Sequence, residues 1–215
     1  MKTLWNWLPS VVDRRVRIAA WASLVSQILI IGTGGAVRLT GSGLGCPTWP
    51  RCTEDSFVST PEMGFHGLIE FGNRLLTFVL IIIAIAMFVF VLKIRKERPE
   101  LFRMALGLGL GIPGQAVIGG VTVLTNLNPY VVGLHYLLSA VLVGVAAVLV
   151  YRVRRGPKRT GWGVAPPVRA MGGALVGVLG ISVVMGILTT GSGPHAGDAG
   201  TARNGLDSWL LQHFH

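Results

Sequence analysis

The sequence predicts an all-α integral membrane protein: an antiparallel four-helix bundle followed by the start of a second bundle that repeats it. Hydrophobic residues make up 51% of the 215 residues and charged residues only 13%, which is too apolar for the surface of a soluble domain. Five apolar segments reach the length of about twenty residues that a helix needs to cross a bilayer. They cover residues 18–37, 67–92, 104–125, 130–151 and 169–190, and a sixth begins at Trp209.

The basic residues predict the orientation of these segments. Fifteen of the nineteen lysines and arginines lie within residues 1–17, between the second and third segments, or in and beside the linker 152–168. The positive-inside rule assigns these regions to the cytoplasm. We therefore expect a multi-pass protein of the cell membrane, with a cytoplasmic N-terminus and outer loops at 38–65, 126–129 and 191–207. The net charge of +10 alone would suggest nucleic acid, but its segregation argues against that partner.

The first outer loop contains both cysteines of the chain, Cys46 and Cys52. Two cysteines in a loop that faces an oxidising compartment form a disulfide more often than they remain free thiols. The same pair in a cytoplasmic loop would have indicated a metal site. We predict a Cys46–Cys52 disulfide.

The second apolar segment opens with polar side chains on one helical face. His66, Glu70 and Asn73 are spaced by four and three residues, so they line up along a helix, and Arg74 borders that face. Ionisable groups are costly in hydrocarbon, so such residues mark candidate functional sites. Arg38 and Arg74 either extend to the interface and pair with Glu70, or bind the carboxylates of a ligand.

Helix-start signals place two histidines at similar depth. Thr60-Pro61 and Asn128-Pro129 each resemble an N-cap followed by a proline at the first helical position. His66 lies six residues beyond Thr60 and His135 seven beyond Asn128, a difference in depth of about 1.5 Å. Imidazoles at matched depth on facing helices suit the two axial positions of a haem iron. The alternative for each is an ordinary interfacial histidine.

A short motif occurs twice, at an offset of 150 residues. Thr40-Gly41-Ser42-Gly43 follows the first segment, and Thr190-Gly191-Ser192-Gly193 follows the fifth. Four spans separate the copies, so the repeat is parallel and a complete molecule is expected to have eight helices.

The repeat divides the chain into two units. Residues 18–151 form the first bundle, and residues 169–215 an incomplete second one, which we expect to be truncated about one turn into its second helix. With Asp207 as the cap of that helix, His213 again falls six residues in.

At these residues the sequence resembles the haem A synthase family. The resemblance covers most of the chain and rests on five runs: Gly35–Cys52 (GAVRLTGSGLGCPTWPRC), Ile69–Leu76 (IEFGNRLL), Gly133–Ser139 (GLHYLLS), Thr190–Asp198 (TGSGPHAGD) and Arg203–Asp207 (RNGLD). It implies an eight-helix membrane oxidoreductase that converts the C8 methyl group of haem O to the formyl group of haem A, for terminal oxidases.

The resemblance also implies roles for individual residues. His66 and His135 are expected to ligate the substrate haem, with Glu70 as the catalytic residue beside the methyl group. His213 resembles a ligand of a second haem, haem b, whose site is expected to be incomplete in this chain. The remaining expected contacts with the haem and its propionates are Arg38, Arg74 and Asn73, and the disulfide Cys46–Cys52 is expected to brace the loop above.

One position departs from the family pattern. Many members carry Glu-x-x-His-Arg where this chain has Glu70-Phe71-Gly72-Asn73-Arg74. Asparagine is a poor haem ligand, so we expect His66 to replace it; Gly-Asn-Arg resembles the actinobacterial branch.

Two other classes of protein fit parts of the pattern. A non-enzymatic membrane b-type cytochrome or haem-handling protein uses the same histidines without needing Glu70, and an inactive fragment is a related alternative. A transporter fits a parallel repeat but usually has broken helices and polar sites at the midplane. The expected partners are haem O, membrane lipid and haem O synthase (protohaem farnesyltransferase), and a homo-oligomer is a further alternative.

Overall fold

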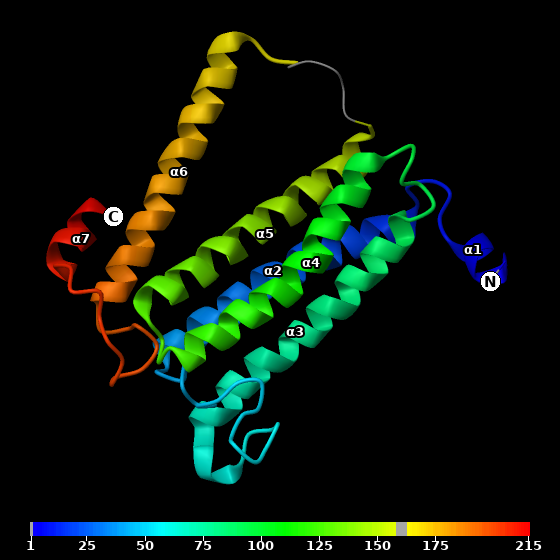
Figure 1. Ribbon diagram of the computed structural model, residues 1–215. Coiled ribbons are helices and arrows are strands. Elements are labelled where there is room, and N and C mark those ends of the chain that lie inside the picture. Colours follow the sequence, from blue (N-terminus) through cyan, green and yellow to red (C-terminus); the bar gives the residue numbers. More distant parts are fainter. Residues whose placement is uncertain (1, 158–162) are drawn as a thin grey trace.

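The computed structural model describes residues 2–157 and 163–215, and the regular structure there is helical throughout (Figure 1). The helices are α1 (Lys2–Trp7), α2 (Arg14–Leu39), α3 (Gly64–Val91), α4 (Pro99–Leu124), α5 (Pro129–Arg155), α6 (Pro166–Ser192) and α7 (Ser208–Phe214), with a 3-10 turn, η1 (Pro61–Met63), before α3. Five helices, α2 to α6, are long and apolar enough to cross a membrane. The predicted all-α membrane fold is confirmed; Lys158 and Arg159 of the predicted linker lie outside the described residues.

Helices α2 to α5 form the antiparallel four-helix bundle (Figure 1). α2 packs against α3 and α5, and α4 closes the ring by packing against the same two helices. α3 and α5 therefore face each other diagonally across the bundle interior. This arrangement puts His66 and His135 on diagonal helices of one bundle; the His66 side chain is exposed and that of His135 is half-buried.

Capping residues start two of these helices outside the apolar segments. The Asp13 side chain accepts hydrogen bonds from the N–H groups of Arg15 and Val16 at the start of α2, and the Asn128 side chain accepts one from Tyr130 at the start of α5. A cap satisfies backbone donors that have no partner within the helix. The helices consequently begin before the first apolar residue, and the predicted Asn128 cap is confirmed.

Helical structure begins at Pro61 after Thr60, as predicted, but the α-helix begins only at Gly64. Pro61–Met63 form one 3-10 turn, and Gly64 then turns the chain at φ 56° and ψ −145°, a conformation that a residue with a Cβ rarely adopts. His66 therefore lies two residues after the start of α3, whereas His135 lies six after the start of α5. The sequence suggested that the depths of the two histidines could be compared by counting from the two caps. The different helix starts rule out that comparison.

The bundle is tightly packed at one end and loosely packed above it. A core that includes Val16, Met87, Leu101 and Leu149 fills the end formed by the start of α2 and the end of α5. Toward the other end, four stretches of the described helices contain no buried residue: 28–39 of α2, 71–79 of α3, 113–119 of α4 and 134–145 of α5. Every residue in these stretches is exposed or half-buried, so the bundle is more loosely packed at this level than in that core.

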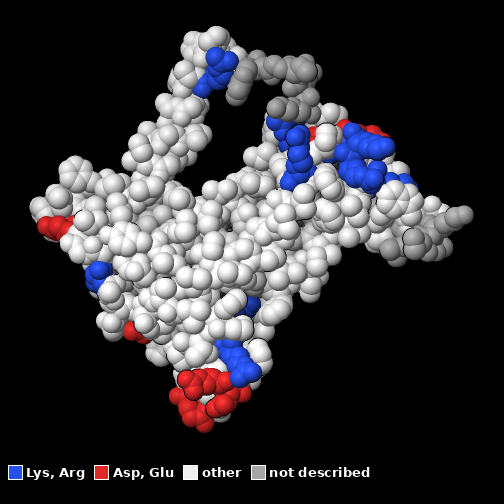
Figure 2. Space-filling view, in the orientation of Figure 1, with Lys and Arg blue, Asp and Glu red and all other residues white. Residues whose placement is uncertain are grey.

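Charged side chains gather at opposite ends of the bundle. Lys and Arg cluster at the end near α1, and Asp and Glu at the tip of the loop that precedes α3 (Figure 2). We call these the basic end and the loop end. The segregation follows the pattern from which the cytoplasmic position of the basic end was predicted.

The C-terminal part packs on one side of the bundle. Among the described helices, α6 packs only against α5 and α7, and most of its apolar side chains are exposed. The Asp207 side chain caps α7 by accepting from Trp209 and Leu210 N–H, as predicted. Gly43 N–H donates to the Gly197 carbonyl at 2.9 Å, so the loop between α2 and α3 touches the loop between α6 and α7.

Candidate functional site

The candidate site lies at the loop end, where the loop between α2 and α3 covers the loosely packed layer. The predicted disulfide is present: Cys46 and Cys52 are bonded, and both side chains are fully buried. Trp49, between them, lies so close to α4 that a Cβ on Gly120 would overlap its indole ring. The loop is therefore held as a compact cover on the bundle.

Glu70 and Arg74 fix this loop to α3. The Glu70 side chain is buried, and its Oε2 accepts a hydrogen bond from Cys46 N–H at 2.6 Å. Arg74, one turn further along, pairs with Oε1 of Glu70 and donates to loop carbonyls, including those of Cys46 at 2.9 Å and Thr48 at 3.0 Å. The predicted pairing of Arg74 with Glu70 is present, and it forms part of a network that carries the loop.

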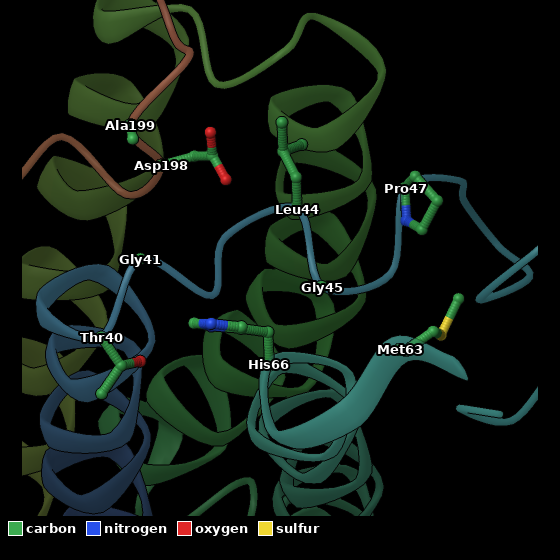
Figure 3. A pocket seen from close by; sticks show the side chains of 9 residues that line it. All are labelled: Thr40, Gly41, Leu44, Gly45, Pro47, Met63, His66, Asp198 and Ala199. Carbon is green, nitrogen blue, oxygen red and sulfur yellow. The ribbon is translucent and has the colours of Figure 1, made fainter. Parts of the chain in front are cut away.

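His66 lies beneath the same loop. Its Nδ1 is 2.9 Å from the Ser42 hydroxyl, which in turn is 2.7 Å from that of Thr40. The imidazole extends from the first turn of α3 toward the end of α2 (Figure 3). It lines a cavity of 580 Å³. The other residues that line the cavity are Thr40, Gly41, Leu44, Gly45, Pro47, Met63, Asp198 and Ala199.

His135 is on α5 and is not among the residues that line this cavity. Its ring lies against α4, where a Cβ on Gly119 would be 3.2 Å from Cε1 of the imidazole. The Nδ1 atom is buried and has no hydrogen-bond partner among the described residues. Gln115 of α4 donates to the His135 carbonyl at 2.9 Å and to the Ser139 hydroxyl at 2.6 Å, which ties α4 to α5 at this level.

The other predicted site residues fall at three places. Asn73 accepts a 2.7 Å hydrogen bond from Thr33 of α2, so it joins α2 to α3. The Nε atom of Arg38 is buried without a partner among the described residues. His213 is on α7, where its Nδ1 is 2.7 Å from the Trp209 carbonyl; α7 packs on α6 and on none of the four bundle helices, so His213 is not brought to the first bundle.

The arrangement suits a haem in the first bundle. The two histidines are on diagonal helices at a loosely packed level of the bundle, and buried nitrogens of His135 and Arg38 lack partners among the described residues. A metal-binding histidine usually engages its second ring nitrogen with a hydrogen-bond partner, and Ser42 supplies one to Nδ1 of His66. Within the described part of the chain, no group of three or more His, Cys, Asp and Glu side chains is placed to hold a metal ion, but bis-histidine ligation requires only two.

Sequence reasoning missed three residues of this site. Ser42 is fully buried beside His66, and its place in the repeated Thr-Gly-Ser-Gly motif was a signal that was available. Gln115 is an uncharged polar residue within an apolar segment, which also indicates an interior position. The contact of Trp49 with Gly120 had no sequence signal, because it joins residues of different elements that are far apart in the chain.

The amino-acid sequence matches a known protein family and several of its relatives. The family model described as COX15-CtaA, cytochrome oxidase assembly protein, matches residues 17–209. Haem A synthase from Geobacillus thermodenitrificans is 29% identical over 149 residues, which is 68% of this chain and 46% of the relative. Haem A synthase from Lysinibacillus sphaericus is 27% identical over 144 residues, 67% of this chain and 47% of the relative. The chain thus spans about half the length of the curated relatives it matches, and no solved structure matches it.

Proposed function

The chain belongs to the COX15-CtaA family of cytochrome oxidase assembly proteins, and on that basis we propose that it serves haem A biosynthesis by oxidising the C8 methyl group of haem O to a formyl group. The observation that carries the proposal is the loosely packed level of the bundle that bears His66 and His135, beneath a disulfide loop that is attached to Glu70. A large planar substrate needs both space between the helices and a cover that separates it from bulk water.

The side chains divide the binding work in this proposal. His66 and His135 ligate the iron of haem O from opposite sides, and Ser42 orients the His66 ring. Arg38 binds a propionate, because its Nε has no protein partner and a guanidinium suits a carboxylate. Arg74 is less suited to that task, since its nitrogens are already engaged by Glu70 and by loop carbonyls.

Glu70 is the proposed catalytic residue. Oxidation of a methyl group to a formyl group with water as the oxygen source releases four electrons and four protons. A carboxylate in reach of the methyl group can take up a proton or stabilise developing positive charge on the carbon. Arg74 and Cys46 N–H hold the Glu70 carboxylate in one orientation, which is what either role requires.

Haem b, the proposed cofactor of the second bundle, supplies one-electron redox chemistry when bound. His213 is its proposed ligand from this chain. Haem O synthase is the proposed source of the substrate, and the proposed location is the cell membrane with the N-terminus in the cytoplasm.

A non-enzymatic b-type cytochrome is the second candidate function. The observation that favours it is that every contact of the Glu70 carboxylate is to the loop or to Arg74, which a structural role explains by itself. Such a protein would keep the histidine pair and the covered interior but would return haem unchanged.

The test is to supply haem O to the protein in lipid nanodiscs, in a full-length context, and to identify the extracted porphyrins by mass spectrometry. The proposal expects a product in which two hydrogens have been replaced by one oxygen. Stable binding of haem O without conversion, in the presence of an electron acceptor, would instead establish the haem-binding cytochrome.

A further inference from the structure

A second cavity lies at the basic end, on the side of the bundle where α2 meets α5. Its volume is 470 Å³, and it lies at the opposite end of α2 from the candidate active site. The residues that line it are Arg17, Ala20, Trp21, Val150, Val153 and Arg154. We call it the basic-end cavity.

Two arginines give this cavity a positive charge that the described residues do not neutralise. Arg17 comes from the first turn of α2 and Arg154 from the last turn of α5, and both are exposed. No hydrogen bond or ion pair joins either guanidinium to another described side chain. Neighbouring arginines differ: Arg15 pairs with Asp13 at 2.8 Å, and Arg98 pairs with Glu100 at 2.6 Å. Asp13 and Glu100 therefore already have arginine partners.

The rest of the lining is suited to a lipid. Trp21 lies four residues after Arg17 on α2, so its indole lies one turn deeper on the same face. Trp21 is exposed, and Ala20, Val150 and Val153 form an apolar wall. Tryptophan is enriched at the level where headgroups meet acyl chains. The cavity thus presents cationic groups at the headgroup level and apolar groups directly below.

We propose that the basic-end cavity binds the phosphate of an anionic phospholipid from the leaflet at that end. Arg17 and Arg154 bind the phosphate oxygens through their guanidinium groups. Trp21 and the two valines contact the glycerol and the first part of the acyl chains. A free phosphate ion offers the same oxygens but leaves the apolar wall without an occupant, which is why the lipid is the favoured source.

The test compares two double variants that lose the same charge from the same helix ends. The double variant Arg17→Gln with Arg154→Gln removes both guanidinium groups that line the cavity. The double variant Arg14→Gln with Arg155→Gln removes two exposed arginines that do not line it. Each protein is purified in detergent to which phosphatidylglycerol or phosphatidylcholine is added. The lipid molecules that stay bound are counted by native mass spectrometry. A parallel titration of inorganic phosphate in detergent measures binding of the free ion.

We expect the cavity variant to bind phosphatidylglycerol about twenty-five-fold more weakly, since the loss of each direct guanidinium–phosphate hydrogen bond costs about a factor of five. The control variant should lose about three-fold or less, because charges outside the cavity act only through a screened field. Trp21→Ala should also release lipid without any change in charge.

Three outcomes would overturn the proposal. Equal losses in the two double variants would mean that only the diffuse positive field attracts the lipid. Equal retention of phosphatidylcholine and phosphatidylglycerol would mean that the negative charge is not recognised. Inorganic phosphate that displaces phosphatidylglycerol from the intact protein would establish a site for the free ion in place of the lipid.

Discussion

The carboxylate of Glu70 accepts a 2.6 Å hydrogen bond from the backbone N–H of Cys46, which is 24 residues earlier in the chain. This contact joins the candidate catalytic residue on α3 to the disulfide loop that covers the bundle interior. Because Arg74 completes the same network through loop carbonyls, the position of Glu70 and the position of the cover depend on each other.

The first prediction separates these two roles of Glu70. Glu70→Gln keeps an oxygen that can accept from Cys46 N–H but removes the negative charge. In the full-length context we expect haem to stay bound while formation of haem A falls by about 100-fold, the usual scale for loss of a general acid or base. Haem retention is read from absorption spectra and product from mass spectrometry.

The control for this variant is Glu62→Gln, an exposed acid of η1 that should leave both measurements unchanged. Loss of haem from the Glu70→Gln protein, with normal activity in the fraction that keeps it, would assign Glu70 to attachment of the loop alone.

The second prediction concerns the iron ligands. His66→Ala and His135→Ala should each abolish the low-spin, six-coordinate haem spectrum of the first bundle, because bis-histidine ligation needs a nitrogen on both sides of the iron. Absorption and electron paramagnetic resonance spectra measure the change. His195→Ala, in an exposed loop position, serves as the control. An unaltered low-spin spectrum in both ligand variants would refute this assignment.

The third prediction tests the orienting contact of Ser42. Ser42→Ala removes the hydroxyl that lies 2.9 Å from Nδ1 of His66 and should weaken haem binding by about ten-fold, as loss of a partner of a metal ligand commonly does. Haem titration of the apoprotein measures the affinity. Thr125→Ala, which removes a hydroxyl bonded only within the end of α4, should have no effect, and an equal loss in both variants would contradict the role given to Ser42.

The fourth prediction concerns the seating of the loop on α4. A methyl group at Gly120 would overlap the Trp49 ring, so Gly120→Ala should lower the free energy of unfolding by about 1–3 kcal/mol through overpacking and expose the loop to protease. Gly114→Ala on the same helix meets no atom within 4 Å and should leave both properties unchanged. Thermal unfolding in detergent and limited proteolysis measure them; identical behaviour of the two variants would show that Trp49 does not hold the loop in place.

The sequence predicted those features of the candidate site that depend on neighbours along the chain. Cys46 and Cys52 are close in sequence and form the predicted disulfide. Glu70 and Arg74 are one helical turn apart and form the predicted pair. The helix start before His66 was predicted only in part, because Thr60-Pro61 begins a 3-10 turn while Gly64 sets the start of the α-helix α3.

The sequence by itself determined the membrane-spanning helices, because burial of about twenty apolar residues in a bilayer depends on local composition. It also determined the helix caps at Asn128 and Asp207, which act within one turn. Only the tertiary structure decided that Glu70 holds Cys46, that Ser42 orients His66, and that the bundle beneath the loop is loosely packed. These features arise where α2, α3, α4 and α5 meet, and helix periodicity specifies which face is apolar but not which residue of another helix that face will contact.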